Sequence, residues 1–286
     1  MELRSLCVRV PASTSNLGAG FDCLGLALDL WLEADLAKGE GTTSYGGTLE
    51  GVTEEEDFLL LALGGAVPPG MRLEVHSSIP LSRGVGSSAA ARVAGLVLAR
   101  LAQGVPVERD AIFSSAQRLE GHPDNAGPAV YGGLVLIAGR PTKLRLHQSL
   151  GVALALPDQR MSTQAARAML PPRMSREETV AQASRSAALL LGLTLGDGDL
   201  IQYGMDDRVA VPHRKQLVRG YDAAVQAGID AGAFHVTLSG AGSGMVAVAA
   251  KELASDVAQA MANALGSQGN AATAVTPAVV EKGFVT

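Results

Sequence analysis

The chain has 286 residues, 34 glycines, 47% hydrophobic residues and a formal net charge of −5. A chain of this length can bury one large core or two of ordinary size, and its apolar content excludes a disordered polymer. The acidic balance, with five lysines among 23 basic residues, argues against a protein that binds nucleic acid through a basic face.

Strand and helix patterns alternate irregularly in the first half of the chain. Every even position from Leu24 to Leu36 is apolar, which predicts a long, half-buried strand. Met71–His76 alternates in the same way, and a further strand is expected over Gly133–Ala138. The segments Ser88–Leu101 and Val107–Leu119 are expected to be helices, the first because it is rich in Ala, Leu and Arg.

The second half repeats this mixture. We expect strands over Val152–Leu156, Phe234–Leu238 and Met245–Ala249. Helices are expected from the capping box Ser175–Glu178 to about Gly192, over Arg214–Ala231 before Gly232, and over Glu252–Leu265 before Gly266. This irregular order favours an α+β layered fold over a doubly wound sheet or a TIM barrel.

Turns, cysteines and hydropathy bound the organisation of the chain. The residues at Arg140–Thr142 and Leu156–Asp158 are turn-like, and either turn is a candidate for a domain boundary, which we expect at about residue 150. Cys7 and Cys23 make neither a disulfide framework nor a zinc site, so we expect buried free thiols. No apolar stretch approaches the ~20 residues of a spanning helix and no secretory signal is visible, so we expect a cytoplasmic protein without membrane contact.

Three segments contain more small residues than ordinary turns need. They are Pro11–Asp22, Pro80–Ala91 and Leu238–Met245. In the second segment, Gly84 and Gly86 permit positive φ, and Ser87 and Ser88 occupy positions where a helix N-cap is expected. Such a loop directs free N–H groups and the positive end of the helix dipole at one spot, which indicates a phosphate cradle.

Two familiar phosphate motifs do not account for this loop. A Walker A loop needs Gly-Lys, and the chain contains no such dipeptide. Gly84–Ala89 matches the loose G-x-G-x-x-A dinucleotide fingerprint, but the regular βαβ context is missing. The third segment lies between two predicted strands, and its three glycines suit a backbone that approaches a ligand.

Polar side chains gather in two further places. Glu120–Asn125 places two carboxylates, an imidazole and an amide within six residues at the end of a predicted helix. Arg167 and Arg214 offer guanidinium groups suited to a bidentate grip on a carboxylate. Taken singly, such residues are more often caps, turn formers or surface side chains than members of a site.

Together, the three small-residue segments resemble in order and spacing the three motifs of the GHMP small-molecule kinases. Pro80–Ala90 carries this resemblance most specifically, and the resemblance extends from about residue 4 to residue 280. Pro11–Gly25 and Glu120–Asn125 are typical of the branch that phosphorylates L-homoserine, and so are Thr163 with Arg167 and the pair His213–Arg214. The resemblance therefore implies ATP-dependent phosphorylation of the L-homoserine hydroxyl, a step toward threonine.

The resemblance also implies a fold and a site. The fold would be α+β, with an ATP-binding domain over 1–150 that resembles ribosomal protein S5 domain 2, a ferredoxin-like domain over 151–286, and the active site between them. ATP would be held by Pro80, Leu81, Arg83, Gly84, Val85, Gly86, Ser87, Ser88 and Ala89, and Mg²⁺ by Ser88 and Glu120. Homoserine would be held by Asn16, Asp22, His122, Asn125, Thr163, Arg167, Arg214, Gly240 and Gly242. Glu120, Asn125 and Arg214 are the catalytic candidates, and a homodimer is left open.

The chain departs from the family pattern at one catalytic position. Other branches carry an aspartate, the candidate base, where this chain has Asn125. An amide cannot accept a proton, so either no strong base acts or a neighbour takes the role. Asp124 is adjacent, but we expect its side chain to point elsewhere.

Three other functions remain open at this point. A kinase for another small alcohol such as mevalonate would share the fold, but that substrate has no ammonium group for Asp22 to bind. A ligand-binding sensor on the same scaffold would have no need of intact phosphate and metal residues. A nucleotide-binding oxidoreductase would rest on the weak dinucleotide fingerprint alone.

Overall fold

The computed structural model describes residues 5–53 and 57–286; the start of the chain, on which the expectation about a secretory signal rests, lies outside this range. The first sheet contains β1 (Leu6–Asn16), β2 (Gly20–Lys38), β3 (Thr43–Gly47), β4 (Met71–Ser77), β5 (Leu134–Ala138) and β6 (Arg140–Leu144). Its order is β3-β4-β2-β5-β6, with β1 paired to β2. β3 and β4 are parallel and the other pairs are antiparallel.

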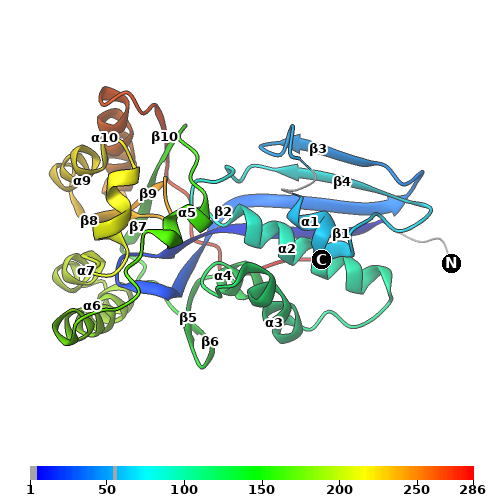
Figure 1. The fold of residues 1–286 in the computed structure, drawn as a ribbon, viewed down its shortest axis with the longest axis horizontal. Coiled ribbons are helices and arrows are strands. Elements are labelled where there is room, and N and C mark those ends of the chain that lie inside the picture. The colour runs from blue at the N-terminus through cyan, green and yellow to red at the C-terminus, as the bar shows by residue number, and fades with distance from the viewer. Residues whose placement is uncertain (1–4, 54–56) are drawn as a thin grey trace.

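Helices cover one face of the first sheet (Figure 1). They are α1 (Phe58–Leu63), α2 (Ser87–Ala102), α3 (Arg109–Glu120) and α4 (Ala126–Tyr131). The two-residue period of β4 reflects this arrangement, because Leu73 and Val75 are buried while Arg72 and Glu74 are exposed. The core of this half therefore lies between the sheet and α2, whose buried positions include Val93 and several alanines.

The second sheet contains β7 (Leu150–Pro157), β8 (Ala233–Leu238), β9 (Met245–Ala250) and β10 (Ala272–Val275). Its order is β10-β7-β9-β8, and all pairs are antiparallel. The helical elements of this half are α5 (Thr163–Ala168), α6 (Arg176–Leu195), α7 (Gly198–Met205), α8 (Val211–Arg214), η2 (Lys215–Leu217), α9 (Tyr221–Asp230), η3 (Lys251–Leu253) and α10 (Ala254–Ser267).

Strand β7 is buried on both of its faces. Leu154 faces the core shared with the first half, with α6 and with α7, whereas Ala153 and Ala155 face the core beneath α9 and α10. The small side chains permit helices to approach the sheet closely. At Gly151 even a Cβ would lie only 2.8 Å from the Cβ of Ala254 on α10.

Two segments interlock the halves of the molecule. The turn of the β1–β2 hairpin reaches toward α6 and α7, as Figure 1 shows for the blue hairpin. There the Ala19 N–H donates to the Gly204 carbonyl (3.1 Å), and the Ser186 hydroxyl donates to the Ala19 carbonyl (2.6 Å). In the other direction, the C-terminal segment returns to the first half, where the Phe284 N–H donates to the Ala129 carbonyl at 2.9 Å.

The expected α+β class and most of the expected strands and helices are confirmed. The helix expected over Arg214–Ala231 is wrong, because Gly220 has φ +84° and separates the short α8–η2 segment from α9. The turn expected at Arg140–Thr142 is part of strand β6. Pro11–Asp22 is mostly the β1–β2 hairpin rather than a loop.

Two helix ends and one cysteine also differ from expectation. Helix α6 passes Gly192 and ends at Gly196, whose φ of +75° terminates it, while Gly192 lets α7 approach. Gly266 lies inside α10 rather than closing it. Both cysteines are free thiols, but Cys7 is exposed and Cys23 only half-buried. Over the residues that the structure describes, no helix is both long and apolar enough to cross a membrane.

Gly25 on β2 provides a test of how tightly the first sheet holds the 120–125 segment. A Cβ at Gly25 would lie 1.9 Å from the Asp124 carbonyl oxygen, whereas a Cβ at Gly266 on α10 would meet nothing within 4 Å. We expect Gly25→Ala to lower the free energy of unfolding by about 1–3 kcal/mol through overpacking. We expect the control Gly266→Ala to raise it by up to about 1 kcal/mol. Urea unfolding measures both, and equal effects would contradict this account of the packing.

Candidate active site

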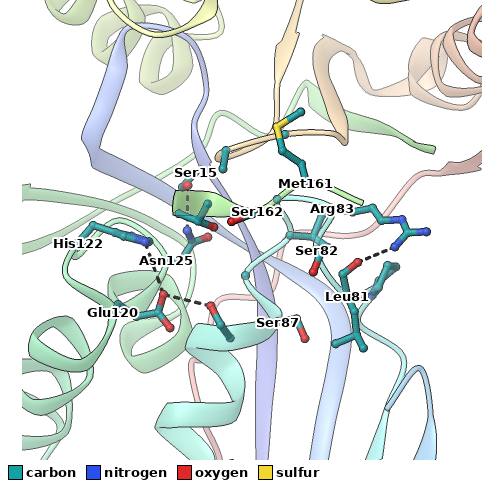
Figure 2. A pocket seen from close by; sticks show the side chains of 18 of the residues that line it. Ser15, Leu81, Ser82, Arg83, Ser87, Glu120, His122, Asn125, Met161 and Ser162 are labelled. Carbon is teal, nitrogen blue, oxygen red and sulfur yellow. Dashed lines mark hydrogen bonds and ion pairs between the residues drawn. The ribbon is translucent and has the colours of Figure 1, made fainter. Parts of the chain in front are cut away.

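A cavity of about 660 Å³ opens between the two halves (Figure 2). It gathers residues from the β1–β2 hairpin, the loop before α2, the 120–125 segment, α5 and α8. Of the residues expected at the site, those that line it are Asn16, Asp22, Pro80, Leu81, Arg83, Gly84, Val85, Gly86, Ser87, Ser88, Glu120, His122, Asn125, Thr163, Arg167, Arg214 and Gly242. Ala89 is instead buried in α2. Gly240 does not line the cavity, but its carbonyl accepts a hydrogen bond from the Asn16 amide at 2.9 Å.

The amino end of α2 opens toward this cavity. Gly86 is its N-cap, with φ +71° and no side-chain cap, so the expectation that Ser87 and Ser88 are capping residues is corrected: they begin the helix. The first N–H groups of a helix have no partner within the helix. With the helix dipole behind them, they form a site suited to an anion.

Arg83 fixes the loop that precedes α2. Its guanidinium donates three hydrogen bonds to main-chain carbonyls, those of Leu81 (2.6 Å), Pro157 (2.7 Å) and Asp158 (2.7 Å). Burial and the neighbouring Arg160 lower the pKa of Arg83, although an arginine stays charged in proteins. Because Pro157 ends β7, Arg83 holds the loop to the second sheet.

Ser239 joins the three small-residue segments. Its hydroxyl donates to the Gly84 carbonyl at 2.7 Å and lies 2.9 Å from the Thr14 hydroxyl. A Cβ at Gly84 would lie 1.9 Å from the Ser239 carbonyl oxygen, so only glycine permits this approach. The next residue, Gly240, donates its N–H to the Ser15 carbonyl at 3.1 Å. Segments that are far apart in the sequence are thereby held in one arrangement.

Glu120 is the centre of a polar cluster beside α2. The Ser88 hydroxyl donates to its carboxylate at 3.1 Å, and Arg92 forms an ion pair with it. The Nε2 of His122 lies 3.6 Å from the same carboxylate, and its Nδ1 lies 2.6 Å from Asp124. The Asp124 side chain was expected to point elsewhere. It contacts His122 instead. Burial opposes the charge on His122, yet the bond to Asp124 and both carboxylate charges raise the pKa of the imidazole.

Asn125 is oriented by two buried serines of β1. The Ser13 hydroxyl donates to the Asn125 Oδ1 at 2.9 Å, and the Asn125 Nδ2 donates to the Ser15 hydroxyl at 3.0 Å. Figure 2 shows Ser15 and Asn125 pointing toward one another. Ser13 acts as a donor to the amide oxygen and Ser15 as an acceptor from the amide nitrogen, so the two ends of the amide cannot be exchanged and the side-chain orientation is defined.

A third group combines one carboxylate and two guanidinium groups. Arg167 on α5 binds Asp22 with two hydrogen bonds, of 2.6 and 3.0 Å. Arg214 on α8 is 2% exposed and donates its Nε to the Ala166 carbonyl at 3.0 Å. Burial and then the charge of Arg167 lower the pKa of Arg214. For Arg167, burial alone would lower the pKa. The hydrogen bond to Asp22 and the negative charge of Asp22 outweigh burial, so the pKa of Arg167 is raised overall.

The balance of charge in the cavity is opposite to that of the chain. Among the described residues that line it, arginines outnumber carboxylates: Arg83, Arg92, Arg160, Arg167 and Arg214 against Asp22, Glu120 and Asp124. The local field therefore favours an anion although the net charge of the chain is −5.

Sequence reasoning missed several residues of the cavity. Among them are Ser15, Phe58, Ser82, Arg92, Arg160, Met161 and Ser162. A local signal existed for Arg92, which follows Ser88 by one helical turn and so lies on the same face of α2. The guanidinium of Arg92 also lies 4.1 Å from the centre of the Phe58 ring. Phe58 begins α1, and no short motif marks it.

Comparisons with known proteins agree on a family. The model of the GHMP kinases N terminal domain matches residues 52–133. The homoserine kinase of Picosynechococcus is 36% identical, and the match covers 99% of both chains; that of Microchaete diplosiphon is 36% identical over 91% of this chain and 90% of its own. The crystal structure of homoserine kinase from Cytophaga hutchinsonii has a TM-score of 0.87 and 29% identity, covering 100% of this chain and 98% of that chain.

A more distant structure matches the fold alone. The L. major mevalonate kinase in complex with R-mevalonate has a TM-score of 0.68 at 17% identity, with 96% of each chain covered.

The Ser239 hydroxyl is expected to set the shape of this cavity. Ser239→Ala leaves the Gly84 carbonyl and the Thr14 hydroxyl without that partner, which costs about 1–3 kcal/mol of unfolding free energy. Because the loop before α2 loosens, nucleotide affinity falls as well. Chemical unfolding and nucleotide titration measure the two effects. The control Ser267→Ala removes an exposed bond to the Ala264 carbonyl and should change neither. Unchanged nucleotide binding in Ser239→Ala would contradict the expected role.

Proposed function

The chain belongs to the homoserine kinase family of the GHMP kinases, and from this membership we propose that it transfers the γ-phosphoryl group of ATP to the side-chain hydroxyl of L-homoserine. The observation that supports this substrate is the content of a single cavity. The amino end of α2 offers free N–H groups to the phosphates, while Asp22, Arg167 and Arg214 offer charges complementary to an amino-acid zwitterion. Mevalonate would match the arginines but would leave Asp22 without an ammonium.

In the proposed complex, each wall of the cavity has a separate task. The loop held by Arg83 and the α2 amino end bind the phosphates, and the arginines beside α5 bind the α-carboxylate of homoserine. Asn125, fixed by Ser13 and Ser15, lies among these groups and orients the hydroxyl. Phosphoryl transfer passes through a loose transition state, so positioning and charge stabilisation provide most of the catalysis.

The residues beside α2 also fit Mg²⁺. Among the described residues no group of three His, Cys, Asp or Glu side chains could hold a metal ion. Mg²⁺, however, needs only one or two hard oxygen ligands from the protein and completes its shell with phosphate and water oxygens. The Ser88 hydroxyl and the Glu120 carboxylate, 3.1 Å apart, supply such oxygens. When bound there, the ion would offset the negative charge of the phosphates.

We also propose that the division near residue 150 is functional. All strands of the first sheet precede residue 145, and those of the second sheet begin at residue 150. The phosphate loop belongs to the first part and Arg167 and Arg214 to the second, so ATP and homoserine would meet where the parts join.

A substrate panel tests the proposed activity. With Mg-ATP, purified protein should phosphorylate L-homoserine far faster than R-mevalonate or galactose, because those alcohols lack the ammonium that complements Asp22. Coupled ADP release measures the rates. Absent turnover of homoserine, or equal turnover of all three alcohols, would contradict the proposed substrate.

Glu120→Gln tests the proposed metal site. The neutral amide keeps the shape of the side chain but removes the charge, so the Mg²⁺ concentration for half-maximal rate should rise about ten- to hundredfold, the loss of one charge-assisted contact of about 1.5–3 kcal/mol. Glu108→Gln, at the exposed start of α3, is the matched control. An unchanged Mg²⁺ titration in a folded Glu120→Gln protein would place the metal elsewhere.

A further inference from the structure

Asp22 and Arg167 already bind each other in the structure. Each carboxylate oxygen of Asp22 accepts one guanidinium N–H, at 2.6 and 3.0 Å, so the pair is bidentate and closed. Asp22 is held in place from behind: its main-chain φ is +56° and its N–H donates to the Asn16 Oδ1 at 2.9 Å. The two side chains are 32% and 35% exposed, so the pair faces the cavity and is accessible from it.

Arg214 adds a cation that this pair does not neutralise. Within the part of the chain that the structure describes, no carboxylate forms an ion pair with Arg214. The guanidinium groups of Arg214 and Arg167 lie 5.3 and 5.9 Å from the centre of the Phe21 ring, which supports both on one side. Asp22, Arg167 and Arg214 together therefore carry one net positive charge and already contain one satisfied ion pair.

A ligand that binds all three of these residues must replace this pair. If it brings only an ammonium, it takes Asp22 and leaves two adjacent guanidinium groups without a counter-ion. If it brings only a carboxylate, drawing Arg167 toward it leaves Asp22 unpaired. Separating a partly desolvated pair without replacing both partners is unfavourable, because one charge stays uncompensated. A zwitterion supplies both replacements in one molecule.

We propose that the substrate binds by ion-pair exchange, in which the Asp22–Arg167 pair opens and each member is satisfied by the opposite charge of one zwitterion. The closed pair then acts as a two-charge filter that discriminates against alcohols with a single charge. This inference rests on the proposed homoserine kinase function and adds to it a physical reason for substrate selection. Because the pair is about one-third exposed, solvent screens the attraction between its charges, and opening the pair costs little free energy.

The filter makes an unusual prediction, because removing a binding residue should improve a poor substrate. 4-Hydroxybutanoate is homoserine without the ammonium, and 3-aminopropan-1-ol is homoserine without the carboxylate. Asp22→Asn frees Arg167, so binding of 4-hydroxybutanoate should tighten about fivefold, the equivalent of about 1 kcal/mol. Arg167→Met frees Asp22, so binding of 3-aminopropan-1-ol should tighten similarly. Binding of homoserine should weaken in both variants. Asparagine suits position 22 because it tolerates positive φ.

Calorimetric titration of the three alcohols measures binding even where turnover is slow, and kcat/KM is measured alongside. Asp206→Asn and Arg208→Met break an ion pair outside the cavity and should leave all three affinities unchanged. Asp124→Asn removes the same charge from the cavity wall but leaves the Asp22–Arg167 pair closed, so it should improve 4-hydroxybutanoate less than Asp22→Asn does. This comparison distinguishes opening of the Asp22–Arg167 pair from the general effect of removing one negative charge from the cavity wall.

The outcomes are distinguishable. Gains for both single-charge alcohols, each in its own variant, support the exchange. If the unaltered protein phosphorylates homoserine but either gain is missing, or if Asp124→Asn matches Asp22→Asn, the exchange is wrong while the kinase assignment stands. If the unaltered protein does not phosphorylate homoserine, the proposed function itself fails.

Discussion

The site depends on one close approach of two loops. Gly84 and Ser239 meet backbone to backbone, and the hydroxyl of the fully buried Ser239 bonds to the carbonyl of the half-buried Gly84. Hydrogen bonds in such surroundings gain strength from the low local dielectric, and an unmade one is costly. The loop before α2 therefore has little freedom to settle elsewhere. Since Thr14 bonds to the same hydroxyl, the β1–β2 hairpin is fixed by the same contact. The hairpin turn and the C-terminal segment add separate hydrogen bonds between the halves.

An acidic chain can hold a polyphosphate because binding is decided locally. The first turn of α2 contributes N–H groups and a helix dipole, neither of which appears in a count of charged residues. Most of the arginines of the cavity are neutralised or used structurally: Arg83 binds main-chain carbonyls, Arg92 binds Glu120 and Arg167 binds Asp22. Arg160 and Arg214 also line the cavity and form no ion pair among the described residues, so their charges are left for a ligand. The cavity therefore offers a small, directed excess of positive charge rather than a basic surface.

Periodic and local signals were readable in the sequence, whereas contacts between distant segments were not. The alternation of β2 and the small residues of α2 follow from burial on one face and from helix propensity, so both elements could be predicted. Gly220, with φ +84°, breaks a segment that otherwise has a helical pattern, and the helical pattern of its neighbours did not indicate this break. The resemblance brought Asp22 and Arg167 to one pocket. Their direct bond, across 145 positions, depends on the fold and carries no local signature.

The described carboxylates of the cavity are all engaged, and this limits how the proposed transfer can proceed. Asp22 binds Arg167, Glu120 binds Arg92 and Ser88, and Asp124 binds His122. Asn125 cannot accept a proton, and its amide is already oriented by two serines. A strong base is not required where the transition state is loose. The new O–P bond is then barely formed, so the hydroxyl stays protonated until late in the transfer. Under that condition, a site gains more from rigid placement of the hydroxyl and the phosphates than from basicity. The hydrogen bonds that join the three small-residue segments to one another and to Asn125 provide that placement.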